Sequence, residues 1–422
     1  MTRLALFSNV AVRALAIFAL AGFSAAPLAA ADETTTEPDI EASFPLADDT
    51  AGSERPDTES TKAFQEFVAT LSEVQEVYLS PKRRVSTAQD VADGNRFLMH
   101  LLAQSLALDL EANASHPVME RLVRPNRKLG GDNADAIYFG TPIDSRHAYK
   151  ITSNQVGAVY SSITIEVGGG DSGYAGGIGA VINDTDYEVQ EDGSFELYIG
   201  GPERDQDWVA MPEHATRIST RHYFEEARSA SADLKRHVPM HIEVLDPVSP
   251  PPTPDDASIA AQIRAVTKHF RSRSLDQPMP DPMPTWVSFT PNKFSQPLKP
   301  GSMAYAAADA AYTQAPYAIA PDEALVITGR WPTCRIGNVT VWNRYLQSYD
   351  YLNRQISLNR KQTVLNQDGS FTIVLAHKDP GVPNWIDTEG RTSGMVFWRF
   401  MMPEGDIETP VATVVKFAEL AN

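Results

Sequence analysis

The chain has 422 residues, of which 42% are hydrophobic, and it carries 54 acidic against 36 basic side chains, a formal net charge of −18. That length suggests two or three domains with a sizeable core, and the acidic balance argues against nucleic acid and anionic lipid surfaces as partners. The single cysteine, Cys334, excludes an internal disulfide and an all-cysteine zinc site.

The first 31 residues have the features of a secretory signal peptide. Arg3 gives a positive start, the apolar run Ala14–Phe23 is ten residues long, and Ala29–Ala31 offers a cleavage site of small residues. Ten apolar residues are too few to span a bilayer, and no later segment is long and apolar enough. We therefore expect cleavage near Ala31 and a soluble exported protein, periplasmic if its source is Gram-negative, with no membrane span.

Two segments precede the β-rich part of the chain. Residues 32–59 hold ten acidic residues, one basic residue and three prolines, a composition typical of a disordered acidic linker. Residues 60–124 are predicted to be helical, because apolar side chains recur at helical spacing from Thr61 onward. The pattern Ser86-x-x-Gln89 is typical of a capping box and predicts the start of a second helix.

The texture changes after Pro125, where short runs of Val, Ile, Tyr and Phe alternate with clusters of Gly, Asn and Asp. This pattern predicts strands and turns, and we assign residues 125–247 to a first β-sandwich and residues 285–422 to a second. Residues 248–284 are rich in proline and form a bridge between them, in which Asp255 or Asp256 caps a short helix.

The strongest pattern is an internal repeat at an offset of 176 residues. Between residues 148–195 and 324–371, ten of 48 positions are identical without a gap, against roughly one in sixteen expected by chance from average usage. The matching pairs include Thr164 and Thr340, Asn183 and Asn359, Asp192–Phe195 and Asp368–Phe371, and, after one inserted residue, Trp208 and Trp385.

Both copies contain an apolar alternation, an Asp-Gly turn and a second alternation, which together are a β-hairpin signature. A single hairpin cannot fold alone, so the duplication implies two β-domains of related topology. We therefore predict a mainly β protein with an α-helical N-terminal segment and two tandem antiparallel jelly-roll-like β-sandwiches.

Five stretches resemble a known family, and they are Arg127–Tyr138, Val341–Gln347, Ser357–Arg360, Ala376–Trp385 and Phe397–Phe400. They are similar to the domain-of-unknown-function family numbered 1214, which often occurs beside a companion family numbered 1254. The similarity covers most of the chain after about Lys62, although the N-terminal part looks shorter and more helical here. The resemblance implies a double jelly-roll-like fold in exported bacterial proteins, and it implies no established reaction.

His377 and Asp379 are the candidate catalytic pair. They lie just past a predicted strand, in a loop that contains two prolines and ends at Asn384 and Trp385, and loops on rigid sheets often carry functional sites. A histidine beside an aspartate is suited to general acid–base chemistry in a hydrolase or a lyase. The alternative is a loop that side-chain hydrogen bonds fix around a buried tryptophan.

A group of arginine, asparagine and aromatic side chains is the candidate ligand-binding set, because such side chains bind carboxylates, phosphates or sugars. The residues are Trp342, Asn343, Arg344, Tyr345, Arg354, Asn359, Arg360, Asn384, Trp385 and Arg399. Arg399 lies among apolar neighbours, so it is expected to need a buried anionic partner, either a ligand or an internal aspartate. The structural alternative is that these side chains tie strand ends together.

A charged turn precedes the first sheet. It contains Arg124, Arg127, Lys128, Asp132, Asn133 and Asp135. We predict a connector held by Arg–Asp pairs, with a ligand-facing loop as the alternative. The nine histidines show no chelating pattern, so we predict no metal site and no cofactor.

These patterns favour a binding function, with an organic ligand such as a glycan or a lipid-derived acid held in a groove of the second sandwich. One alternative is a hydrolase or lyase that uses His377 and Asp379. Another is an envelope structural or assembly protein that forms a homo-oligomer.

Overall fold

The computed structural model describes residues 56–169, 174–301 and 303–420. The predicted signal peptide and most of the predicted acidic linker lie outside the described residues. The described chain is mostly β, with four sheets and a helical N-terminal segment, which confirms the predicted fold class. Among these residues, no helix combines the length and the apolar composition that a membrane crossing requires.

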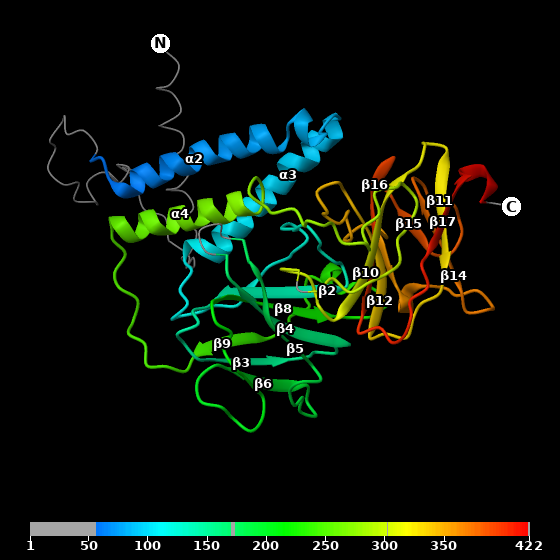
Figure 1. Ribbon diagram of the computed structural model, residues 1–422. Helices are drawn as coiled ribbons and strands as arrows, with labels where there is room; N and C mark the ends of the chain where they lie inside the picture. Colours follow the sequence, from blue (N-terminus) through cyan, green and yellow to red (C-terminus); the bar gives the residue numbers. More distant parts are fainter. Residues whose placement is uncertain (1–55, 170–173, 302, 421–422) are drawn as a thin grey trace, which may run out of the picture. The chain divides into compact units, whose positions relative to one another are not determined.

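The helical segment combines N-terminal helices with the helix of the proline-rich bridge. Its elements are α2 (Glu59–Tyr78), η2 (Pro81–Arg83), α3 (Ala88–Ser105), the π-helical turn η3 (Leu106–Leu110) and α4 (Asp256–Ser272). Helices α2 and α4 lie side by side (Figure 1), and Asp256 accepts hydrogen bonds from the backbone N–H groups of Glu59 and Ser60. Arg264 then pairs with Glu66, so the two helices run in the same direction.

Two helix starts test the predicted caps. Helix α3 begins with a capping box of Thr87 and Asp90, so the predicted box at Ser86 is wrong by one residue. The hydroxyl of Thr87 accepts from the Asp90 N–H at 3.0 Å, which satisfies an N–H group that the helix itself leaves free. The predicted cap of α4 at Asp255 is confirmed, because its carboxylate accepts from the Ser258 N–H.

The first sandwich consists of two sheets with strand orders β1-β2-β8-β4-β5 and β7-β6-β3-β9. Its strands are β1 (Glu120–Arg121), β2 (Ala136–Pro142), β3 (Tyr149–Asn154), β4 (Tyr160–Val167), β5 (Gly177–Asn183), β6 (Ser194–Ile199), β7 (Trp208–Val209), β8 (Ala215–Tyr223) and β9 (Met240–Val244), with the short helix η5 (Ala230–Ala232). Ile163 and Ile165 of one sheet join Ile151 and Leu197 of the other in one buried core.

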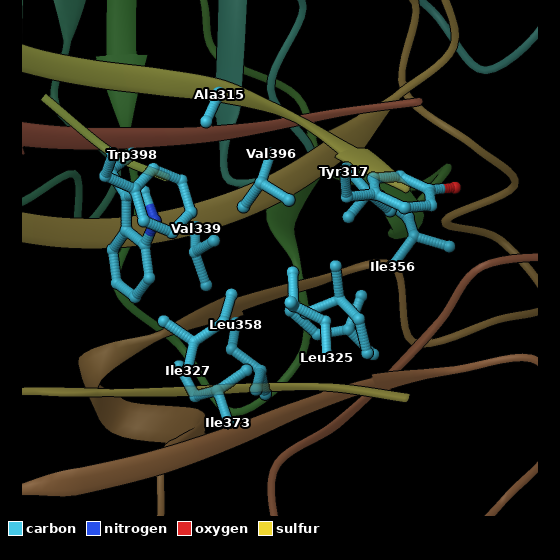
Figure 2. Close-up of a cluster of buried hydrophobic side chains, with 14 of the residues drawn as sticks. Ala315, Tyr317, Leu325, Ile327, Val339, Ile356, Leu358, Ile373, Val396 and Trp398 are labelled. Atoms are coloured by element: carbon cyan, nitrogen blue, oxygen red, sulfur yellow. The ribbon is translucent and has the colours of Figure 1, made fainter. Parts of the chain in front are cut away.

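The second sandwich has strand orders β10-β16-β12-β13 and β15-β14-β11-β17. Its elements are β10 (Ala310–Ala318), β11 (Glu323–Gly329), β12 (Ile336–Trp342), β13 (Ser357–Asn359), η6 (Arg360–Gln362), β14 (Phe371–Ala376), β15 (Trp385–Asp387), β16 (Ser393–Met401), β17 (Val411–Lys416) and η7 (Phe417–Glu419). Figure 2 shows its core, where Val339 and Trp398 of one sheet face Ile327 and Ile373 of the other.

The two sandwiches share one topology, which confirms the predicted duplication. The sheet β2-β8-β4-β5 corresponds strand by strand to β10-β16-β12-β13, and β7-β6-β3-β9 corresponds to β15-β14-β11-β17. The predicted hairpin is wrong, because Ile163 lies in β4 and Leu197 in β6, on opposite sheets of the sandwich. Each sandwich is antiparallel except for one short parallel pair, β6 with β7 and β14 with β15.

The sandwiches meet through corresponding sheets. A buried cluster contains Tyr160 and Tyr223 from the β2-β8-β4-β5 sheet and Tyr312, Trp342 and Phe397 from the β10-β16-β12-β13 sheet. Trp342 stacks on Phe397 with the ring centroids 4.4 Å apart. Because side chains alternate across a strand, each of these sheets has one face in its own sandwich core and the other face at this junction.

Candidate functional site

The structure gives His377 and Asp379 separate partners. Nδ1 of His377 lies 2.7 Å from the Thr388 hydroxyl, and Nε2 lies 3.1 Å from the Ala320 carbonyl oxygen. Asp379 accepts from the Gly381 N–H at 2.8 Å. These contacts fix the loop by side-chain hydrogen bonds and bring no acid–base pair together, so the catalytic role stays a prediction.

Arg344 and Tyr345 attach the second sandwich to the helical segment. Arg344 donates to the Arg83 carbonyl at 2.8 Å, and its Nη1 lies 3.3 Å from an Asp90 carboxylate oxygen. Tyr345 stacks on Phe97 of α3 with the ring centroids 5.8 Å apart. Both side chains therefore have a partner in the fold.

Two other predicted arginines form ion pairs. Arg354 donates to Asp387 at 2.7 Å, and Arg360 donates to both oxygens of Glu225 at 2.6 and 2.8 Å. The pair of Arg360 joins the two sandwiches, because Glu225 follows β8 of the first. Neither arginine points to a shared groove with Arg344.

Asn343, Asn384 and Trp385 serve the local backbone. The side-chain oxygen of Asn343 accepts from the Tyr345 N–H at 2.9 Å. The Asn384 amide donates to the Thr372 carbonyl at 2.9 Å, and the Trp385 indole donates to a carbonyl of β14. The structure thus distributes these members of the predicted set over several places in the second sandwich.

Trp342, Asn359 and Arg399 are the members of the set at the junction between the sandwiches. The indole N–H of Trp342 donates to the Asp132 carbonyl at 2.9 Å. The Asn359 amide donates to an Asp135 carboxylate oxygen at 3.2 Å. The junction, and not a groove of the second sandwich alone, is where predicted residues from distant positions meet.

The predicted charged turn contributes to this junction. Asp132 accepts from the backbone N–H of Ser348 at 2.7 Å, and the Lys128 ammonium donates to the Ser348 carbonyl at 2.9 Å. Asp135 accepts from the Asn338 amide at 3.0 Å. The predicted Arg–Asp pairs are therefore wrong, because these buried side chains bond to groups of the second sandwich instead.

Two crossed hydrogen bonds relate the halves by approximate two-fold symmetry. The segments Ala134–Tyr138 and Ala308–Tyr312 align at an offset of 174 residues, which makes Asp135 and Asp309 equivalent. Asn359 of the second half donates to Asp135 of the first, and its repeat partner Asn183 of the first half donates to Asp309 of the second at 3.0 Å. Reciprocal contacts of this kind are typical of a two-fold interface.

A cavity of about 110 Å³ lies at this junction. For comparison, an engineered cavity of about 150 Å³ holds benzene, so this one has room for a group of about four to six heavy atoms. The lining residues that matter below are Tyr138, Arg221, Arg273, Tyr305, Tyr312 and Arg399.

Each half contributes one tyrosine–arginine pair to the cavity. Tyr138 of β2 lies opposite Arg221 of β8 in the strand register, and Tyr312 of β10 lies opposite Arg399 of β16. The two registers make Arg221 and Arg399 equivalent positions of the duplicated fold. The cavity therefore contains two related cationic groups, one from each sandwich.

Arg221 is fully engaged with the protein. Its Nη1 donates to the Thr164 hydroxyl at 2.7 Å, and its Nη2 donates to the carbonyls of Tyr305 at 2.9 Å and Ala306 at 3.3 Å. Tyr305 has a left-handed backbone with φ of 62°, which is uncommon for a bulky residue. Gly131, its equivalent in the first half, has φ of 89°.

Arg399 is only 6% exposed, and most of its hydrogen-bonding capacity is unused. Its Nη2 donates to the Gly131 carbonyl at 3.4 Å, whereas Nε and Nη1 have no partner among the described residues. The hydroxyl of Thr340, the repeat partner of Thr164, is also buried and without a partner there. The bond between threonine and arginine that the first half makes is therefore not made in the second.

Aromatic rings surround the Arg399 guanidinium. Its carbon atom lies 5.0 Å from the ring centroid of Phe397, 5.6 Å from Tyr312 and 5.7 Å from Tyr223. No described carboxylate oxygen lies within 4.0 Å of its nitrogens. Although burial disfavours the charged form, the interactions with Tyr223, Tyr138 and Tyr312 raise the pKa of Arg399 above its ordinary value. Arg399 is therefore a buried cation without an internal counter-ion in contact.

The acids near the cavity carry less charge than their number suggests. Burial raises the pKa of the Asp132 carboxyl, and burial likewise raises the pKa of Glu166. The oxygens of Asp132 accept from Ser348, and Glu166 lies on the outer face of β4 next to Ser219. A partly neutral acid compensates a nearby arginine poorly, so the cavity favours an anion.

Sequence reasoning included Arg399 but missed Arg221, Arg273 and the tyrosines. A usable signal was present, because the sequence Ala-Asp-Ala-x-Tyr occurs at both Ala134–Tyr138 and Ala308–Tyr312. Its offset of 174 differs from the main offset of 176, and Arg221 matches Arg399 only at 178. Short insertions and deletions between the strands therefore hid these equivalences.

Comparison with known proteins supports the fold. An uncharacterized protein from Burkholderia cenocepacia matches with 24% identity and a TM-score of 0.71, over 85% of this chain and 98% of that chain. The VPA0106 protein from Vibrio parahaemolyticus matches with 11% identity and a TM-score of 0.45, over 77% of this chain and 98% of that one. No curated protein shows a significant match. Residues 332–405 match a family described as "Protein of unknown function (DUF1214)", which confirms the resemblance and places that family's domain in the second sandwich.

Proposed function

We propose that this protein binds a small organic acid in the cavity between its two sandwiches, with Arg399 as the anchor. The observation that carries the proposal is the buried Arg399 guanidinium, whose Nε and Nη1 lack partners among the described residues. A buried charge without a counter-ion is costly. A ligand carboxylate would provide that counter-ion and accept the unused N–H groups.

This proposal modifies the predicted groove of the second sandwich, because the first sandwich supplies half of the lining. The aromatic rings around Arg399 suit the apolar part of an organic acid. The volume of about 110 Å³ favours a short acid, or the acidic end of a longer one. We also propose that the protein acts after export, which mass spectrometry of the protein purified from cell extracts tests through a mature chain beginning near Asp32.

Isothermal titration calorimetry with propionate, malonate and succinate tests the binding proposal. We expect saturable binding to the wild type and loss of detectable binding in Arg399→Met, a variant with similar length and no charge. The matched control is Arg354→Met, which removes a half-exposed arginine that pairs with Asp387 outside the cavity. Loss of binding in Arg354→Met with retention in Arg399→Met would instead locate the site in the originally predicted groove.

A further inference from the structure

Arg273 is a third arginine at the cavity, and it comes from outside the duplicated sandwiches. It is the residue that ends α4, so the helical segment delivers it. Its guanidinium lies 4.1 Å from the ring centroid of Tyr305 and 5.2 Å from that of Tyr174. Among the described residues, no carboxylate oxygen lies within 4.0 Å of it.

Arg273 and Arg399 occupy different depths of the same cavity. Arg399 is buried, whereas Arg273 is half-buried and lies with the half-buried Tyr305. The cavity volume equals that of a sphere about 6 Å across, so one short molecule is able to contact both guanidinium groups. An acidic group on Arg399 would sit inside, and a second one on Arg273 would sit nearer the solvent.

The neighbouring acids leave room for a second negative group. Glu166 interacts electrostatically with Arg221 and Arg273, but it forms no contact pair with either of them within 4.0 Å. Its Oε1 accepts from the Ser219 hydroxyl at 3.4 Å, and burial raises the pKa of its carboxyl, which reduces its value as a counter-ion. Arg221 is held by three protein acceptors. Arg273 and Arg399 are therefore the two arginines with capacity for a ligand.

We propose that the cavity selects a short dicarboxylate, with one carboxylate on Arg399 and the other on Arg273. The proposal rests on the proposed function and adds the ligand class and a specificity-determining residue. A monocarboxylate would leave the outer arginine without an anion, and a compact anion such as phosphate would not reach both arginines. Arg273 therefore decides between ligands, whereas Arg399 is needed for all of them.

Calorimetry on the full-length mature protein at pH 7 tests this proposal with propionate, malonate, succinate and inorganic phosphate. We expect malonate or succinate to bind at least about tenfold tighter than propionate. In Arg273→Gln, the affinity for the dicarboxylates should fall by about tenfold, while the affinity for propionate changes less than about twofold. The matched control is Arg271→Gln on the same helix, which removes pairs with Glu73 and Asp276 outside the cavity and should leave all four affinities unchanged.

The outcomes separate the two proposals. Equal affinities for propionate and the dicarboxylates, or an equal loss of both in Arg273→Gln, would overturn the dicarboxylate proposal and leave the binding function intact. Phosphate that binds more tightly than either dicarboxylate would overturn the requirement for two separate groups. Failure of every carboxylate to bind the wild type would overturn the proposed function itself. Circular dichroism of each variant confirms that it is folded before its affinity is interpreted.

Discussion

Arg221 and Arg399 occupy the same register position in the two copies of one fold, yet their surroundings differ. Arg221 has acceptors at Thr164, Tyr305 and Ala306, whereas Arg399 has one weak acceptor at Gly131. The first arginine therefore stabilises the junction between the sandwiches. The second adds an uncompensated charge to it, which a folded protein retains only at a cost in stability.

The difference illustrates how a duplicated fold divides its tasks. Both copies keep the tyrosine–arginine pair, Tyr138 with Arg221 and Tyr312 with Arg399, because the strand register is the same. One copy completes its hydrogen bonds internally, and the other leaves N–H groups for something external. Functional sites commonly break local rules of satisfaction in this way.

The largest expected effect separates the two arginines by stability. In Arg221→Met, three acceptors lose their donor, and we expect the free energy of unfolding to fall by about 4 kcal/mol. In Arg399→Met without ligand, an uncompensated buried charge is removed, so the free energy should stay unchanged or rise by about 1 kcal/mol. Urea denaturation followed by tryptophan fluorescence measures both.

This pair of variants also tests the comparison itself. Equal losses of stability in the two variants would show that Arg399 has an internal partner as important as those of Arg221. The site would then lose its main support.

The next effect concerns Asp135, which latches the first half to the second. Burial raises the pKa of its carboxyl to about 6, and the hydrogen bonds from Asn338 and Asn359 only partly oppose this. The folded state thus favours the neutral acid, so this contribution to stability is present below about pH 4 and is lost as the pH rises to about 6. The shift corresponds to about 3 kcal/mol.

Asp135→Asn removes this titration, since an amide stays neutral at every pH. We expect the free energy of unfolding of the wild type to fall relative to that of the variant between pH 4 and pH 6. Chemical denaturation at several pH values measures the difference. A variant whose stability follows the wild-type pH profile would show that Asp135 ionises as easily in the folded chain as in the unfolded one.

The sequence predicted the duplication well because alternating burial preserved its strands. Ile163 and Val339 are core positions in both copies, and the Asp-Gly turns survive at the same offset. It predicted the pairing poorly, because a turn signature does not reveal that the strands on either side enter opposite sheets. Local polar patterns also misled, as with Ser86, where the helix uses Thr87 as its cap instead.

The candidate site was only partly predictable for a related reason. Arg399 was identifiable because an arginine among Phe397, Trp398 and Phe400 must find a buried anion. Arg344 and Arg360 resemble it in sequence, but their partners, Asp90 and Glu225, come from distant segments. Only tertiary packing shows which arginines already have a counter-ion and which do not.

The smallest expected effect sharpens the comparison at a single hydroxyl. Thr164 accepts a hydrogen bond from Arg221, so Thr164→Val leaves a buried N–H without an acceptor, and we expect a loss of about 1.5 kcal/mol. The hydroxyl of Thr340 is buried without a partner among the described residues, so Thr340→Val removes an unsatisfied group at constant volume. Stability should then stay equal or rise by about 0.5 kcal/mol. The two substitutions are chemically identical and lie at matching positions of β4 and β12, so the difference between their unfolding free energies isolates the environment. If both cost the same, Thr340 bonds to Arg399 as Thr164 does to Arg221, and the second half would be as complete as the first.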